Sequence, residues 1–398
     1  MAKEVTRHVP QAVQFLLWGK AAGRCEFAGC NKPLWKCSVT QEQVNIAQKA
    51  HIYSFSDTGP RGNEDIPKAA VNDFNNLMLV CHECHTKMDA EKDGGRYTVS
   101  LLQAMKEQHG RRIEIVTSIA PERKSQVLLY GANIGQHSSP LRLSETAHAL
   151  FPGRYPADDK AIELGMVNSS FNDRDEAFWR VESHNLRQQF TQRVAERLAT
   201  GDLRHLSIFA LAPQPLLIQL GTLLTDIPQA EVYQLHREPQ GWQWPAGEST
   251  VDFIREDPVS PSGSAALVFA ISATVTDDRI RSVIGPDASI WRLTIATPHN
   301  DFVKTREQLT AFRQIVRPLL DQIKAAHGQN TPLHIFPAMP VSLSVELGRI
   351  RMPKADMPWV LYDQIAGRGG FVPTLSIPDA QAPVTVSDAS ERKETRDE

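Results

Sequence analysis

The chain of 398 residues contains no apolar run near the roughly 18 residues that a membrane-spanning helix needs. Its N-terminal segment is amphipathic and lacks the cleavage site of a signal peptide. With 41% hydrophobic and 22% charged residues, the composition is that of an ordinary soluble protein. We therefore expect a cytoplasmic protein with no membrane partner.

Cysteine is scarce, with five residues in all and none beyond position 84. A disulfide framework would spread its cysteines more evenly along the chain. Four of them form two close pairs, Cys25 with Cys30 and Cys81 with Cys84. This spacing predicts four thiolates on one structural Zn2+ in a reducing compartment. Cys37, between the pairs, is expected to be a packed free thiol, with a ligand role left open.

A strong net charge is also absent, because the formal value is -3. Residues 1–126 carry 17 Lys and Arg against 14 Asp and Glu, whereas the remainder carries 26 against 32. The modest positive excess of the first part favours contact with a polyanion there. Taken alone, it is weak evidence.

Periodicity divides the chain into two domains and a tail. Helices are predicted over 5–22, 85–93 and 99–117, before a polar stretch at 120–125. Beyond it, strands over 125–134, 205–213, 230–237, 265–273, 289–297 and 332–340 alternate with helices over 177–199 and 303–328. This alternation predicts an α/β fold with mainly parallel strands, built as a tandem duplication of a Rossmann-like unit. We place the domains at 1–122 and 127–377, and expect residues 378–398 to be disordered.

The first domain also carries an ordered set of polar residues. His51 follows Ala50, Asn76 lies five residues before Cys81, and His85 directly follows Cys84. Alone, each has an ordinary structural reading, such as a core histidine or a turn asparagine. In this order and at these distances, the residues resemble an HNH nuclease of the ββα-metal type with a structural zinc. The resemblance implies an α+β domain in which His51 is the general base, Asn76 orients the imidazole or joins the metal site, and His85 binds a catalytic Mg2+ or similar ion.

One position departs from the family pattern. Many HNH nucleases have an Asp directly before the first His as a metal ligand, and Ala50 stands there in this chain. The catalytic ion would then need another oxygen donor. Asp89, four residues after His85 and so on the same helical face, is the first candidate, and Asp73 is the second.

The second domain has its own resemblance, carried by segments 205–245 and 334–363. Both segments, HLSIFALAPQPLLIQLG and HIFPAMPVSLSVELG at their starts, resemble the SAVED domain, a sensor made of two fused CARF-like, Rossmann-like halves. The whole ordered chain then resembles an HNH-SAVED effector of cyclic-oligonucleotide-based antiphage signalling (CBASS). The resemblance implies an antiphage, abortive-infection effector that binds a cyclic di- or trinucleotide and cuts double-stranded DNA without sequence specificity, as a homo-oligomer once activated.

Ligands of open parallel sheets bind beyond the carboxyl ends of the strands. The loops expected there and the aromatic residues that could stack on bases give a candidate ligand set: Gln136, His137, Tyr155, Gln214, Trp242, Ser272, Thr274 and Pro340. Trp244 and Trp291 are further candidates for stacking, but each aromatic also has a reading as core. His236 and Arg237 could pair with phosphate or with a surface carboxylate.

Two other functions remain open from the sequence. One is an HNH restriction enzyme whose second domain reads modified DNA, which would need no small molecule. The other is a non-catalytic, ligand-responsive DNA-binding protein with a degenerate HNH knuckle, an option that Ala50 keeps open.

Overall fold

The computed structural model of the chain describes residues 8–62, 65–91, 95–135, 141–166, 171–247, 252–365 and 369–378. The chain divides into two compact units, Met1–Glu122 and Arg123–Glu398. Gln136 and His137 of the candidate ligand set lie outside the described residues, as does the expected tail from residue 379 on. No described helix combines the length and the apolar character that crossing a membrane requires.

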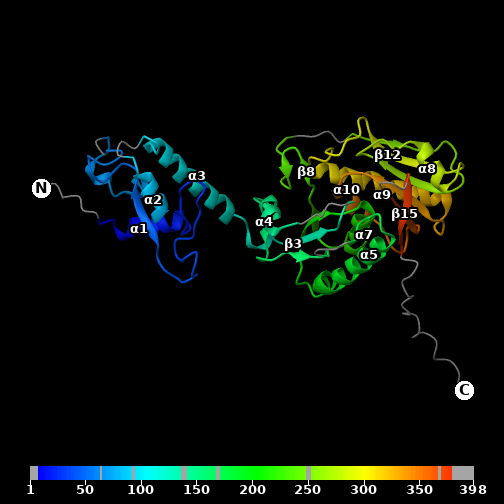
Figure 1. The fold of residues 1–398 in the computed structure, drawn as a ribbon, viewed down its shortest axis with the longest axis horizontal. Helices are drawn as coiled ribbons and strands as arrows, with labels where there is room; N and C mark the ends of the chain where they lie inside the picture. The colour runs from blue at the N-terminus through cyan, green and yellow to red at the C-terminus, as the bar shows by residue number, and fades with distance from the viewer. Residues whose placement is uncertain are drawn as a thin grey trace, which may run out of the picture. The chain divides into compact units, whose positions relative to one another are not determined.

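The first unit consists of a two-stranded sheet with helices packed around it (Figure 1). Its elements are α1 (Gln11–Lys20), β1 (Ala47–His51), η1 (Lys68–Ala70), η2 (Phe74–Asn76), β2 (Leu77–Cys81), α2 (His82–Met88), α3 (Val99–Thr117) and η3 (Pro121–Arg123). Strands β1 and β2 are antiparallel, with Ala47 opposite Cys81 and His51 opposite Leu77. Every residue of β2 is buried, so this strand is the centre of the small core. The chain therefore runs strand, strand, helix through this core.

The predicted helices of the first unit are present with shifted ends. Helix α3 covers the predicted residues and begins at Thr98, whose side chain accepts a hydrogen bond from the Leu101 amide. Helix α1 is shorter than the predicted 5–22. Helix α2 begins three residues before the predicted 85–93 and ends at Met88.

The second unit contains two largely parallel sheets, as the alternation of strands and helices predicted. In the first sheet β3 (Lys124–Gly131), β6 (Leu206–Leu211) and β7 (Ala230–Val232) run parallel, with β4 (Tyr155–Pro156) and β5 (Ile162–Glu163) also paired to β3. Around it lie α4 (Leu143–Thr146), η4 (Ala147–Leu150), α5 (Glu176–Phe190), a π-helical turn η5 (Thr191–Ala195), α6 (Glu196–Ala199) and α7 (Gln214–Leu224).

The second sheet has the order β10-β12-β11-β13-β14-β15. Its strands are β10 (Phe253–Glu256), β11 (Ala265–Ala270), β12 (Ser289–Ile295), β13 (Leu333–Ala338), β14 (Trp359–Gln364) and β15 (Phe371–Ile377), and its helices are α8 (Asp277–Ile284), α9 (Arg306–His327) and α10 (Val341–Arg349). The four inner strands are parallel, and the edge strands β10 and β15 are antiparallel to their neighbours.

One predicted strand is wrong. The segment 230–237 divides into β7 and a separate two-residue strand β8 (His236–Arg237), which forms a hairpin with β9 (Gln240–Gly241). The division occurs at Gln234, whose side-chain oxygen accepts hydrogen bonds from the amide and hydroxyl of Ser342 in α10, at 3.2 and 2.7 Å. This contact turns the chain out of the first sheet and toward the second half of the unit.

The two halves repeat the same arrangement. Strands β3-β6-β7 in one half and β11-β13-β14 in the other have the same parallel order, and α7 and α10 follow the equivalent strands β6 and β13. Residue identities at a constant offset of 127 positions relate the two segments: Leu206 and Leu333, Ile208 and Ile335, Phe209 and Phe336, Pro213 and Pro340, Leu216 and Leu343, Leu220 and Leu347, Gly221 and Gly348. The duplication is thus visible in residue identity as well as in topology.

The repeated glycines are where the two halves meet. Helices α7 and α10 lie side by side in the second unit (Figure 1). A Cβ atom on Gly221 would lie 2.1 Å from the carbonyl oxygen of Val345, and one on Gly348 would lie 2.0 Å from that of Ile218. Only residues without a side chain allow the backbones to approach this closely. The carboxyl ends of β6 and β13 are thereby brought to one place.

Candidate functional sites

Four cysteine side chains converge in the first unit, as the sequence predicted. The sulfur atoms of Cys25, Cys30, Cys81 and Cys84 all lie within 4.8 Å of one another. Cys25 and Cys30 come from the loop after α1, Cys81 ends β2, and Cys84 lies in the first turn of α2. Cys37 lies outside this group.

The geometry of the four sulfurs fits a tetrahedral zinc ion. Zn–S bonds of about 2.3 Å in a tetrahedron separate the sulfurs by roughly 3.8 Å, and the sulfurs of Cys30 and Cys81 are 3.8 Å apart. The amide of Cys81 donates to the sulfur of Cys25 at 3.3 Å, a contact that favours a thiolate. Burial raises the pKa of the Cys25 thiol to about 12, so a bound cation is what would keep it ionised. These residues could therefore hold a metal of the zinc type.

The predicted general base, His51, lies at the end of β1 beside the segment that carries Asn76. The Ile52 amide donates to the carbonyl oxygen of Asn76 at 2.8 Å, which fixes the two segments together. The His51 ring contacts Asn72, whose Oδ1 is 3.0 Å from Nε2, and the ring of Phe55, whose centroid is 5.6 Å away. The sequence did not single out Asn72; its position four residues before Asn76 is the one signal that could have drawn attention to it.

Asn76 has a different role from orienting the His51 ring. Its buried side chain accepts from the Tyr53 amide at 2.7 Å, and its Nδ2 donates to the carbonyl oxygens of Tyr53 and Val71 at 3.1 and 2.9 Å. The amide group thus joins the chain after β1 to the segment before η2. In the structure Asn72 contacts the imidazole, whereas the side chain of Asn76 is hydrogen-bonded to main-chain groups of the loop.

His85 and Asp89 are adjacent, as their spacing predicted. His85 Nε2 is 3.6 Å from one carboxylate oxygen of Asp89, and both side chains are about one-third exposed. The other carboxylate oxygen of Asp89 accepts from Arg61 at 2.7 Å. Asp89 therefore also forms an ion pair with Arg61, which the sequence did not predict.

Ala50 is buried in the core of the first unit, and its position offers no oxygen donor near His51. Asp73, the second candidate ligand, is exposed at the start of η2. Within the described ranges, the four cysteines are the one group of three or more His, Cys, Asp or Glu residues whose ligand atoms converge.

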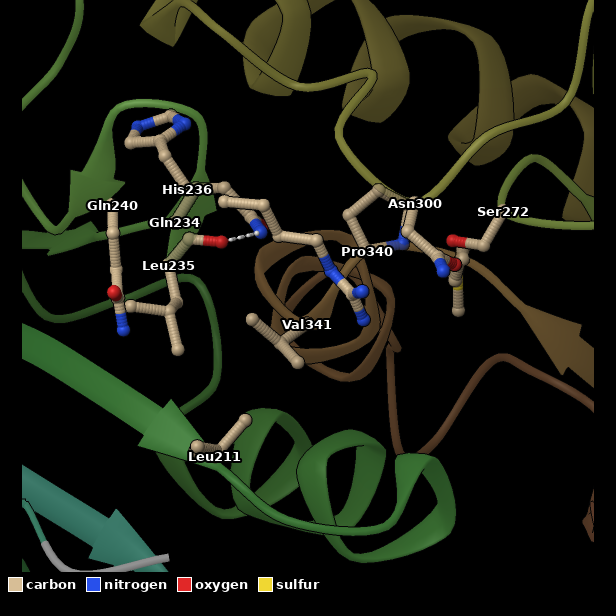
Figure 2. A pocket seen from close by; sticks show the side chains of 11 residues that line it. Leu211, Gln234, Leu235, His236, Gln240, Ser272, Asn300, Pro340 and Val341 are labelled. Carbon is tan, nitrogen blue, oxygen red and sulfur yellow. Dashed lines mark hydrogen bonds between the residues drawn. The ribbon is translucent and has the colours of Figure 1, made fainter.

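In the second unit, a cavity of about 580 Å³ lies between the two halves (Figure 2). Leu211 and Ser272 follow strands β6 and β11, and Met339 to Val341 join β13 to α10. The complete lining is Leu211, Gln234, Leu235, His236, Arg237, Gln240, Ser272, Asn300, Met339, Pro340 and Val341. The cavity thus lies at the carboxyl ends of the parallel strands and has the size of a small-molecule site.

Its polar groups include an unpaired cation. The guanidinium of Arg237 makes no hydrogen bond or ion pair with any residue that the structure describes. His236 is buried, and both of its ring nitrogens lack a partner among the described residues. Burial chiefly, with the positive charge of Lys304, lowers the pKa of His236. Amide side chains from Gln240 and Asn300 complete the set (Figure 2).

The β8–β9 hairpin joins this cavity to the second half. The amides of Arg237 and Glu238 donate to the carboxylate of Asp301 at 3.1 and 3.3 Å. Lys304 donates to the carbonyl oxygen of Glu238 at 3.0 Å and pairs with Asp301 at 2.5 Å. The residues that line the cavity on the first half are thus held by residues of the second half.

Of the candidate ligand residues that the structure describes, Ser272 and Pro340 line the cavity. Tyr155 pairs with Lys124 at the opposite, amino end of β3. Trp242 is buried with its ring 5.2 Å from that of Phe209, which is the core role left open by the sequence.

Two more members of the set lie near the cavity without lining it. Thr274 is exposed, and Gln214 instead accepts from the Met339 amide and the Ser344 hydroxyl, each at 3.3 Å. Gln214 and Pro340 were expected in loops after strands, but Gln214 begins α7 and Pro340 directly precedes α10. Gln240 and Asn300 could have been found as polar residues that follow predicted strands, whereas Gln234 lies inside the predicted strand 230–237.

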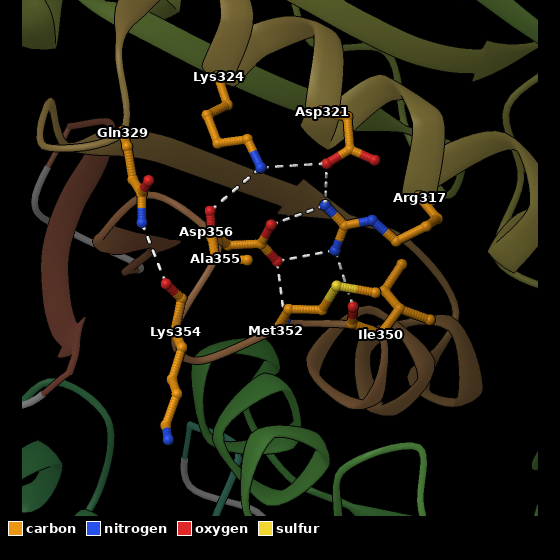
Figure 3. A network of polar contacts seen from close by, with 9 residues as sticks. All are labelled: Arg317, Asp321, Lys324, Gln329, Ile350, Met352, Lys354, Ala355 and Asp356. Atoms are coloured by element: carbon orange, nitrogen blue, oxygen red, sulfur yellow. Dashed lines mark hydrogen bonds and ion pairs between the residues drawn. The ribbon is translucent and has the colours of Figure 1, made fainter.

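The far end of α10 is anchored by a network of ion pairs (Figure 3). Arg317 of α9 makes two hydrogen bonds with the carboxylate of Asp356, at 2.6 and 2.8 Å, and a third with the carbonyl oxygen of Ile350 at 3.0 Å. Asp356 also accepts from the Met352 amide at 2.8 Å, and its side chain is 3% exposed. Helix α10 therefore starts at the cavity and ends at a fixed loop.

The fold defines the second unit as a duplicated α/β domain with a cavity between its halves. Residues 186–377 match the family model of the SAVED domain, described as "SMODS-associated and fused to various effectors sensor domain". This part of the chain contains a SAVED sensor domain. The match begins within α5, although the first sheet includes β3 further upstream.

Two solved structures illustrate what the chain is similar to. A Cap4 SAVED/CARF-domain receptor of Acinetobacter baumannii with the cyclic trinucleotide 2'3'3'-cAAA is 15% identical, with a TM-score of 0.43, over 74% of this chain and 61% of that chain. A Cap4 receptor of Moraxella osloensis is 10% identical, with a TM-score of 0.36, over 77% of this chain and 68% of that chain. A comparison with curated proteins gave no match.

Proposed function

We propose that the protein is a DNA endonuclease that is switched on when a cyclic oligonucleotide binds its SAVED domain. The observation that carries the ligand part is the 580 Å³ cavity inside the matched domain. Its unpaired Arg237 suits a phosphate, and its amide side chains suit the edges of nucleobases. The proposed biological role is that of an antiphage effector in CBASS.

The nuclease part rests on the first unit. An HNH centre needs a histidine at the end of one strand and another on the helix after the second strand, and His51 and His85 lie at those places. When His51 Nε2–H donates to Asn72 Oδ1, the lone pair is on Nδ1, the nitrogen that would take a proton from the attacking water. The water oxygen then bonds to phosphorus, and the leaving oxygen departs and takes a proton from solvent.

The divalent ion of this reaction would be held chiefly by His85, with water and substrate phosphate as its other ligands. Mg2+ commonly keeps several waters and takes few ligands from protein, so a sparse protein site is compatible with it. The ion would stabilise the charge that develops on the phosphoryl oxygens. The four cysteines would hold a separate Zn2+ with a structural role.

Substituting the base separates catalysis from sensing. His51→Ala is expected to abolish DNA cleavage while cyclic-nucleotide binding stays at the wild-type level, because the cavity belongs to the other unit. His8→Ala, at an exposed histidine of the same unit, is the matched control and should cleave normally. Wild-type cleavage by the His51 variant would refute the assignment of the base.

A second function is favoured by a specific observation. The Ala50 side chain supplies no metal ligand, and the Asp89 carboxylate is engaged by Arg61. A SAVED protein with such a knuckle would bind DNA in response to its ligand without cutting it. DNA retention in a mobility-shift assay, with no cleavage in Mg2+, Mn2+ or Ni2+ and with ligand present, would favour this function.

A further inference from the structure

One arginine of the first unit is buried among acceptors from two different elements. The side chain of Arg61 is 3% exposed. Its Nε donates to the Ile52 carbonyl oxygen at 2.6 Å, and its Nη1 donates to the Met88 carbonyl oxygen at 2.7 Å. Its Nη2 donates to the His51 carbonyl oxygen at 3.2 Å and to Asp89 at 2.7 Å. A buried arginine with all its bonds directed at main chain and one carboxylate is a connecting group.

The elements that it connects carry the two candidate histidines. The carbonyls of His51 and Ile52 are at the end of β1, whereas Met88 and Asp89 are at the end of α2, the helix that carries His85. The guanidinium is planar and its donors have fixed directions, so it sets the positions of its acceptors relative to one another. Arg61 thereby fixes the separation between the strand that carries one histidine and the helix that carries the other.

Asp89 extends this connection to the His85 ring. One of its oxygens is on Arg61, and the other is 3.6 Å from His85 Nε2. A carboxylate that faces one nitrogen of an imidazole orients the ring and leaves the other nitrogen for a metal. Because the Asp89 carboxylate lies between the Arg61 guanidinium and the His85 ring, it is better placed to orient the ring than to bind a metal ion directly.

We propose that Arg61 is a positioning residue of the nuclease site, and that Asp89 acts with it to orient His85 rather than as a metal ligand. This inference rests on the proposed nuclease function. It replaces the earlier expectation that Asp89 supplies the oxygen missing at Ala50.

The first test replaces the planar guanidinium of Arg61 and keeps its positive charge. Arg61→Lys in the full chain should lower the cleavage rate constant and the apparent affinity for Mg2+, on the order of 10–100-fold. The KM for DNA, the zinc content and cyclic-nucleotide binding should stay at wild-type values. Arg111→Lys, an exposed position on α3, is the matched control and should change none of these quantities. Wild-type cleavage and metal dependence in Arg61→Lys would overturn the proposal.

The second test does not need activity. Nitrogen chemical shifts of the histidine rings report tautomer and surroundings in the full-length protein. Arg61→Lys should shift the signals of His51 and His85, and Asp89→Asn should shift that of His85. His109, which contacts the carbonyl oxygen of Ala21, is the internal control and should not move.

The outcomes separate this inference from the proposed function. If the wild-type protein never cleaves DNA, the proposed nuclease function is refuted. The nitrogen chemical shifts of the histidine rings would still test whether Arg61 and Asp89 position these rings. If Arg61→Lys does not fold, Asp89→Asn decides, because it keeps the three main-chain bonds of Arg61. An unchanged His85 signal in Asp89→Asn would overturn the proposal.

Discussion

Replacing Gly221 by Ala is expected to destabilise the second unit, because α7 and α10 meet backbone to backbone at this residue. The new Cβ would lie 2.1 Å from the Val345 carbonyl oxygen and 2.8 Å from the Arg349 amide nitrogen, whereas ordinary contacts of a Cβ begin at 3.4 Å. Both neighbours are helix backbone, so the two helices must separate. Overpacking of this kind costs about 1–3 kcal/mol, and the better helix propensity of Ala returns up to about 1 kcal/mol. We expect a net loss of about 1–2 kcal/mol in the free energy of unfolding.

The assay is urea unfolding of the full chain, followed by tryptophan fluorescence and far-UV circular dichroism. Gly348→Ala, whose Cβ would lie 2.0 Å from the Ile218 carbonyl oxygen, should behave like Gly221→Ala. Gly110→Ala is the control, since it lies within α3 and its Cβ would meet nothing within 4 Å. It should be as stable as the wild type or slightly more so. A Gly221 variant that is as stable as the Gly110 variant would refute the close contact of the helices.

Three further predictions concern metal, ion pair and pH. Cys81→Ser should lower the zinc content, measured by mass spectrometry, and unfold the first unit, since one of four converging thiolates is lost. Asp356→Asn should lower the free energy of unfolding by about 3 kcal/mol, because Arg317 loses its buried charged partner. Burial chiefly, with help from neighbouring arginines, lowers the pKa of His205 to about 4. Between about pH 6.5 and 4 the unfolded chain binds a proton at this site that the folded chain does not. The free energy of unfolding should therefore decrease as the pH is lowered through this range. His205→Asn should reduce this pH dependence, with stability measured by thermal unfolding.

Each of these predictions has a control. Cys37→Ser should keep the zinc, because Cys37 is outside the four-sulfur group. Asp257→Asn breaks an ion pair with Arg255 whose side chains are 44% and 27% exposed, and should cost less than about 1 kcal/mol. The His205 variant should match the wild type in its pH dependence between pH 7 and 9. Zinc retention by Cys81→Ser, equal losses at Asp356 and Asp257, or an unchanged acid slope in His205→Asn would contradict the respective argument.

Local pattern predicted much of the architecture. The 19 residues of α3 and the long helix α9 have an apolar period that the sequence displays directly. Helices α7 and α10 were missed because nearly all of their residues are buried, which removes the alternation of apolar and polar faces that marks a surface helix. The identities 127 positions apart would have revealed both, since Pro and Gly recur at the same two ends of each helix.

The sites were predictable where they depend on short spacing and unpredictable where they depend on packing. The members of each cysteine pair are close in the sequence, so the pairs themselves could be recognised from spacing, and hydrogen bonds between the loop after α1 and β2 bring the two pairs together. Arg61 and Asn72 lie in the long connection between β1 and β2, where nothing in the sequence indicates which polar residue turns inward. The cavity likewise combines residues of two halves, which are joined by the contact of α7 with α10 and by the hydrogen bonds of Asp301 and Lys304 to the β8–β9 hairpin.

The most direct test of the central claim is plasmid cleavage by the purified protein in Mg2+, with and without a panel of cyclic di- and trinucleotides. Cleavage that requires one member of the panel, and that is lost in Arg237→Ala, is the result we predict. Cleavage that needs no cyclic nucleotide would contradict ligand gating and favour a restriction enzyme. The absence of cleavage with a nucleotide that demonstrably binds would contradict the nuclease.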